Sequence, residues 1–267
     1  LSRPDLNQLA STKPGPIQLS PDHVAAFLLL ATRFGALLLM SPPIGGGAVP
    51  ATVRVAVVVA LAVCFSSLVP APAQGWSLWQ VVAALAGEVV LGLTMAVGLN
   101  LAFAAFAIGA RILDTQIGFG IGQVFNPLTR QQTPILTGLF AQVALVLFFT
   151  TDAPDGVLRG VVLSIQAYPP GTAWPLQSAL GPVIAQVAGL FALGFAIVAP
   201  VVFCLLLVEL GLGVISRSLP QMNMFAMGIP IKIVVGLTAL AIWTTGSLAL
   251  LLRTHAAVFK GWEAMFR

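Results

Sequence analysis

Residues 78–110 read LWQVVAALAGEVVLGLTMAVGLNLAFAAFAIGA, an apolar run in which Glu88 is the single charged residue. A helix needs about 20 apolar residues to cross the hydrocarbon core of a bilayer. This run is longer than one crossing, so a helix along it must tilt, kink or leave the hydrocarbon. The run predicts a membrane protein that contains unusually long helices.

The composition of the whole chain indicates the same class. The 267 residues are 58% hydrophobic and 7% charged, with a mean hydropathy of +1.02, whereas soluble domains carry roughly 25% charged residues. Apolar segments of helical length occur at 24–41, 50–69, 79–108, 134–151, 181–215 and 230–252. We expect an all-α integral membrane protein with about six hydrophobic helical segments, several kinked or overlong, joined by buried irregular loops. Pro200 predicts a kink in the fifth segment.

The polar residues narrow the range of functions. Residues 1–22 are polar and proline-rich, and we interpret them as a flexible leader. The net charge is +4, but the twelve basic residues form no stripe, so we expect no nucleic-acid partner. The chain has no Walker loop, no His-Glu-x-x-His and no Gly-x-Ser-x-Gly, and neither histidine has metal-ligand neighbours at a suitable spacing. We therefore expect no enzymatic activity, no cofactor and no metal.

Acidic residues inside apolar segments are costly and need an explanation. Glu88 recurs with Gly92 on one helix face, beside a small residue that permits close packing. One interpretation is a structural contact to a neighbouring helix, with Arg33 or Arg54 as the basic partner; the other is a proton or ion relay. We favour the structural interpretation for Glu88, and we interpret Glu209 as a structural charge near the membrane interface.

An irregular stretch, QIGFGIGQVFNPLTRQQTP, separates the third and fourth segments at 116–134. Its three glycines allow backbone conformations that other residues avoid. Its apolar side chains are poorly suited to water, and an irregular backbone cannot face lipid. We expect it to lie inside protein, where it lines or fills a cavity.

A second irregular stretch, SRSLPQMNMFAMGIPIK, occupies residues 216–232. Three methionines surround Phe225, and thioethers adapt to changing surfaces. Pro220 and Pro230 interrupt helical structure on either side. We expect a non-helical linker buried in protein.

These stretches resemble a known family. The sequence PQMNMFAMGIPIK at 220–232 is similar to the C-terminal signature of FliR, a component of the flagellar type III export gate, and of its injectisome relatives. Four other matches follow the family's order: SPPIGGGAVPATVR at 41–54, GEVVLGL at 87–93, QIGFGIGQVFNP at 116–127 and YPPG at 168–171. Over roughly residues 25–252, the chain is identified as a member of the FliR/SctT family.

The resemblance implies a non-enzymatic subunit of the type III protein export gate, which forms and plugs the pore for unfolded flagellar proteins. It implies a hetero-oligomer with FliP and FliQ homologues, contacts with FlhB and with FlhA as a further candidate, and a place in the bacterial inner membrane at the flagellar basal body. Residues 23–180 would form a FliP-like helical part that includes the plug loop 116–133, and residues 181–267 a FliQ-like hairpin with a basic tail. The alternative is an ion- or proton-coupled secondary transporter that uses Glu88.

Two sets of site residues follow from the resemblance. The pore plug would consist of Gly118, Phe119, Gly120, Ile121, Gly122, Val124, Phe125, Asn126 and Pro127. The gate loop between subunits would consist of Pro220, Gln221, Met222, Asn223, Met224, Phe225 and Met227. Family members carry Asp-Pro more often than Asn-Pro at the end of the plug, so Asn126 is a departure that bears on charge there and leaves the seal unaffected.

Overall fold

The computed structural model describes all residues except 1–20, 48, 67–76, 120–133, 219–223 and 267. Every regular element in the described residues is a helix, which confirms the all-α class. The helices are α2 (Pro21–Leu39), α3 (Pro42–Gly45), α4 (Ala51–Ser66), α5 (Leu78–Ile117), α7 (Ile135–Thr150), α8 (Ala153–Ala167), α9 (Leu176–Ser218) and α10 (Met224–Phe266).

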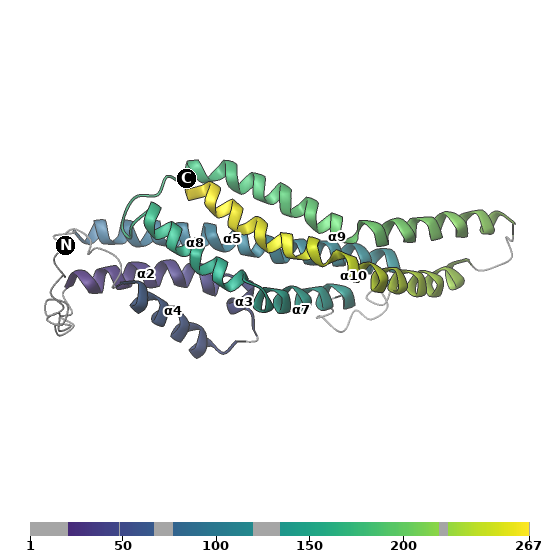
Figure 1. Ribbon diagram of the computed structural model, residues 1–267, viewed down its shortest axis with the longest axis horizontal. Helices are drawn as coiled ribbons and strands as arrows, with labels where there is room; N and C mark the ends of the chain where they lie inside the picture. The colour runs from purple at the N-terminus through teal and green to yellow at the C-terminus, as the bar shows by residue number, and fades with distance from the viewer. Residues whose placement is uncertain (1–20, 48, 67–76, 120–133, 219–223, 267) are drawn as a thin grey trace, which may run out of the picture.

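Helix α5 is the axis of an elongated bundle (Figure 1) and contacts α2, α7, α9 and α10. It begins at a capping box, in which the Ser77 side chain accepts from the Gln80 N–H and the Gln80 side chain accepts from the Ser77 N–H. It ends at Gly118, whose φ of 102° lies in the left-handed region that favours glycine. The apolar run therefore forms one helix of 40 residues.

Helices α9 and α10 pair as a long hairpin. Each has 43 residues, which corresponds to about 65 Å of helix. Helix α9 contains Pro182 and Pro200, and Figure 1 shows it change direction midway, as a proline inside a helix predicts. The end of the hairpin where α9 stops and α10 starts projects beyond the rest of the bundle (Figure 1).

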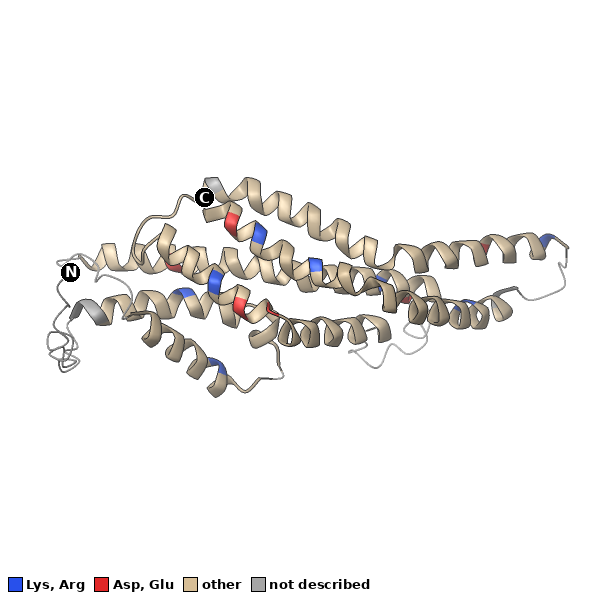
Figure 2. Ribbon diagram, viewed as in Figure 1, with Lys and Arg blue, Asp and Glu red and all other residues tan. Residues whose placement is uncertain are grey.

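Three described helices, α5, α9 and α10, are long and apolar enough to cross a membrane. Helices α7 and α8 meet at a bend of 69° and would add a fourth span if they count as one. Helices α2 and α4 are apolar but shorter. Charged side chains are isolated along otherwise uncharged helices (Figure 2), in keeping with the composition.

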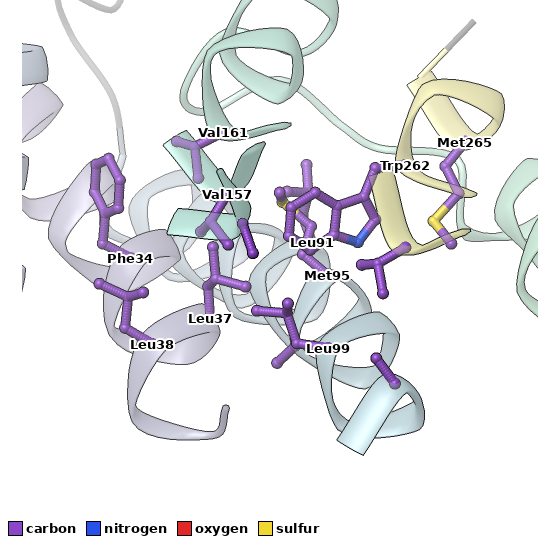
Figure 3. Packing of buried hydrophobic residues seen from close by; sticks show 14 of the residues in the cluster. Phe34, Leu37, Leu38, Leu91, Met95, Leu99, Val157, Val161, Trp262 and Met265 are labelled. Atoms are coloured by element: carbon purple, nitrogen blue, oxygen red, sulfur yellow. The ribbon is translucent and has the colours of Figure 1, made fainter. Parts of the chain in front are cut away.

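Two hydrophobic clusters fill the bundle. The first joins α2, α5 and α8 to the end of α10, where Trp262 is fully buried. Figure 3 shows Trp262 among Leu91 and Met95 of α5 and Val157 of α8. The second cluster joins the last turns of α5 to α7 and to the middle of α9. The molecule thus has one core near the end of α10 and another near the end of α5.

The structure extends several of the predicted segments. Helix α10 continues to Phe266, beyond the predicted boundary at 252, because the tail returns to the first core. The prediction of a non-helical linker over 216–232 is wrong for the described part, where α9 runs to Ser218 and α10 begins at Met224 with Pro230 inside it. Helix α8 was not predicted.

Candidate functional site

A buried ion pair links the first helix to the central one. Arg33 Nε of α2 lies 2.5 Å from Glu88 Oε2 of α5, and Arg33 Nη2 donates to Glu88 Oε1 at 3.1 Å. The two side chains are 1% and 2% exposed. Of the two arginines considered from the sequence, Arg33 is therefore the partner, whereas Arg54 donates to the carbonyls of residues 45, 46 and 49.

The same pair holds the turn that follows α8. Arg33 Nη1 donates to Ser164 Oγ at 3.2 Å, and Nη2 donates to the Tyr168 carbonyl at 2.9 Å. The Gly171 N–H donates to Glu88 Oε1 at 2.9 Å. Gly171 has a φ of 86°, so the turn requires glycine there. This network, the Arg33–Glu88 network, joins α2, α5, α8 and the YPPG turn in one set of charge-assisted bonds.

Close helix packing surrounds the network. A Cβ atom at Gly92 would lie 2.6 Å from the Arg33 carbonyl oxygen and 2.7 Å from the Ala36 Cβ, so α2 and α5 touch where only glycine fits. Met95 and Leu99 continue the same buried face of α5. This face of α5 therefore packs against α2.

A second buried carboxylate, which the sequence analysis did not single out, lies at the far end of α5. Asp114 is 1% exposed. Its Oδ1 accepts from the Leu136 N–H at 3.0 Å, and its Oδ2 accepts from the Thr137 N–H at 2.9 Å and from the Thr137 hydroxyl at 2.8 Å. Two features of the sequence could have pointed to this contact. Asp114 is a lone acidic residue in an apolar region, and the helix that follows the irregular stretch has Pro134 at its N-cap, which cannot cap it through a side chain.

Two residues of the predicted plug belong to the described structure. Gly118 is the left-handed residue that ends α5, and Phe119 packs, partly buried, against the second core. The remaining predicted plug residues lie outside the described residues: Gly120, Ile121, Gly122, Val124, Phe125, Asn126 and Pro127. We call residues 118–134, which contain the predicted plug residues, the plug segment. Asp114 directly joins the two helices that precede and follow it.

The predicted gate loop is described in part. Pro220, Gln221, Met222 and Asn223 lie outside the described residues. Met224 and Phe225 form the first turn of α10, and Met227 is 44% exposed. The described part of the predicted loop, the first turn of α10, therefore lies at the projecting end of the α9–α10 hairpin (Figure 1).

Glu209 of α9 pairs with Lys232 of α10 and joins the two helices of the hairpin. Their side chains are 39% and 23% exposed, so the pair lies at the edge of the apolar surface. Glu209 was predicted to lie near the membrane interface, and its partner Lys232 was not predicted.

The charged groups that the structure describes within the bundle are arranged to hold helices together. Glu88 and Asp114 have both carboxylate oxygens engaged by protein donors. No group of three His, Cys, Asp or Glu side chains with metal-binding geometry occurs in the described residues. The site thus consists of two buried networks, one around Arg33 and Glu88 and one around Asp114, next to the segment that contains the predicted plug.

Known proteins are similar to this chain over most of its length. The family described as "Bacterial export proteins, family 1" matches residues 24–257. The flagellar biosynthetic protein FliR of Bacillus subtilis (strain 168) is 32% identical over 83% of this chain and 86% of its own length. FliR of Caulobacter vibrioides is 27% identical over 84% of this chain and 89% of its own length.

A relative from a secretion system also matches. The secretion system apparatus protein SsaT of Salmonella typhimurium is 30% identical over 58% of this chain and 61% of its own length. These similarities confirm the resemblance to the FliR/SctT family on which the site residues were assigned. The chain belongs to the bacterial export proteins of family 1.

Proposed function

We propose that the chain is a non-enzymatic subunit of a type III protein export gate. The observation that carries this proposal is the similarity to FliR over 83% of the chain, together with a family match that spans every helix from α2 to most of α10. Membership of a type III export apparatus follows from the FliR and SsaT relatives. The finer proposal is that the chain helps to form the export pore and supplies its plug.

The exposed apolar surface of the α9–α10 hairpin supports a place in a larger assembly. Large apolar side chains are exposed along both helices of the hairpin, among them Phe203, Leu210 and Val214 of α9 and Val234 and Ile242 of α10. Exposed apolar surface of this extent needs a cover of lipid or protein. We propose that homologues of FliP and FliQ provide the protein part of that cover, that FlhB and FlhA act at the same gate, and that the assembly lies in the bacterial inner membrane at the flagellar basal body.

The plug proposal rests on composition and on the frame around the segment. A pore that passes an unfolded chain leaks ions unless apolar side chains fill it at rest. Phe119 and Phe125 supply aromatic bulk and the three glycines supply backbone freedom. Asp114 bonds to Leu136 and Thr137 and so joins the end of α5 to the start of α7, the two helices that precede and follow the segment.

The Arg33–Glu88 network supports a structural role for Glu88. A coupling carboxylate must exchange protons or ions with water, whereas Glu88 is 2% exposed and bound by a guanidinium and a backbone N–H. The proposal therefore treats Glu88 and Glu209 as helix-joining charges. It also treats residues 23–180 as the FliP-like part and residues 181–267 as the FliQ-like hairpin.

The experiment is co-expression of a tagged chain with its FliP and FliQ homologues, followed by purification and conductance measurements in liposomes. We expect a single stable complex that is closed to ions. Deletion of residues 118–125 should leave the complex intact and raise its resting conductance. A chain that purifies alone contradicts the gate assignment, and a deletion complex that stays closed contradicts the plug assignment.

A further inference from the structure

Helix α7 begins without a cap from its own sequence. Its N-cap residue is Pro134, which has no side-chain acceptor, and the first turn contains no acidic residue. The first N–H groups of a helix have no partner within the helix and are costly to bury unsatisfied. Leu136, at the second helical position, is 3% exposed, so its N–H needs an acceptor from protein.

Asp114 supplies that acceptor from another helix. Its two carboxylate oxygens receive the backbone N–H groups of Leu136 and Thr137 and the Thr137 hydroxyl, at 2.8 to 3.0 Å. A carboxylate at a helix N-terminus also gains from the helix dipole. The contact crosses 22 and 23 residues of sequence, so Asp114 caps α7 from one turn before the end of α5.

The last turn of α5 is fixed on its other side as well. Ile117 is fully buried, and a Cβ atom at Gly236 of α10 would lie 2.6 Å from Ile117 Cγ1. The Gly118 N–H then bonds back to the Asp114 carbonyl as α5 ends. Asp114 thus ties the turn that packs on α10 to the start of α7.

We propose that Asp114 is the positioning residue that holds the two flanks of the plug segment together, so that the segment enters and leaves the bundle at a fixed separation. The clamp itself rests on contacts among described residues, and its consequence for the seal rests on the proposed function. No residue of the clamp belongs to the plug residues that fill the pore. The clamp therefore predicts a leak from a change outside the plug.

The test is hydrogen exchange and conductance on the assembled gate that carries Asp114→Asn. The substitution keeps the shape of the side chain and removes its charge and one acceptor oxygen. We expect the amides of Leu136 and Thr137 to exchange on the order of tenfold faster, and the resting conductance to rise severalfold toward that of the 118–125 deletion. The milder Thr137→Val should change both in the same direction by less, and serves if Asp114→Asn fails to assemble.

Asp155→Asn is the matched control, because Asp155 is an acidic residue in the first turn of α8 that is 58% exposed. It should leave the Leu136 and Thr137 amides and the conductance unchanged. Unchanged exchange in Asp114→Asn and Thr137→Val would overturn the clamp. Faster exchange with wild-type conductance, in a gate that the 118–125 deletion opens, would overturn the positioning role. A closed deletion gate would instead count against the plug, and the exchange rates would still decide the clamp.

Discussion

Removal of one charge from the Arg33–Glu88 network should destabilise the protein strongly. Glu88→Gln keeps the size of the side chain but leaves the Arg33 guanidinium 1% exposed without its counter-ion. Breaking a buried pair in this way costs about 3–5 kcal/mol. In a domain of this size that loss lowers the midpoint of thermal unfolding by on the order of 10 °C.

Substitution of Arg33, alone and together with Glu88, separates the contribution of the ion pair to stability from that of the surrounding packing. Arg33→Met should cost about as much as Glu88→Gln, because it leaves a buried carboxylate with only the Gly171 N–H. The double variant Arg33→Met/Glu88→Met should cost less than the sum of its single replacements by about 3 kcal/mol, since no buried charge remains. The double variant still loses the hydrogen bonds to the Tyr168 carbonyl and from the Gly171 N–H, and leaving these groups unpaired costs about 1–3 kcal/mol each.

The assay is thermal unfolding of the detergent-purified gate, with export of a reporter substrate measured in cells. Asp155→Asn provides the control, because the Asp155–Arg159 pair is exposed and should contribute less than about 1 kcal/mol. Glu88 variants that still assemble should export. Single variants with wild-type unfolding midpoints, or an intact complex that cannot export after Glu88→Gln, would refute the structural role of the network.

Four further substitutions test packing and a partly exposed ion pair, again by the unfolding midpoint of the assembled gate. Gly160→Ala should lower the stability by about 1–3 kcal/mol, because the added methyl would overlap the buried Trp262 ring. The control is Gly181→Ala, whose added methyl meets nothing within 4 Å and should be neutral or slightly stabilising. Equal unfolding midpoints of the two variants would contradict this prediction. His255→Phe should stabilise the protein by about 1 kcal/mol. Both ring nitrogens of His255 are buried without a hydrogen bond among the described residues, and three phenylalanine rings surround them. A lower unfolding midpoint would indicate that the imidazole has a hydrogen-bond partner in the assembled gate. Lys232→Met should change stability by less than about 1 kcal/mol, since its carboxylate partner is 39% exposed, and a larger loss would mean that the hairpin depends on this pair.

Hydrophobic length and periodicity predicted the helices well, because an apolar run has few alternatives to a helix in a membrane. Each of the six apolar segments corresponds to a helix over most of its described residues. Helix α8 escaped detection because Asp155 and Arg159 interrupt its apolar pattern, although these two residues pair with each other on the surface. Helix α5 continues past its predicted end at 108, because Arg111 is exposed and the buried Asp114 accepts hydrogen bonds from the start of α7.

Site features that depend on nearby sequence were predicted, whereas those that depend on how distant helices pack were not. Glu88 stood out because a carboxylate in an apolar helix needs a partner, yet the choice between Arg33 and Arg54 depends on how α2 and α4 pack, which periodicity does not encode. The pairing of Glu209 with Lys232 likewise depends on the register of the α9–α10 hairpin. Prolines in 216–232 suggested a break, but α10 accommodates Pro230 near its start.

The most direct test of the export-gate assignment is a cryo-EM map of the full chain assembled with its FliP and FliQ homologues. We expect one complex in which this chain lines a closed pore, with the side chains of Phe119 and Phe125 across the constriction and Asp114 bound to the start of α7. A complex in which the segment 118–127 lies on the outer surface, with the pore closed by other residues, would contradict it.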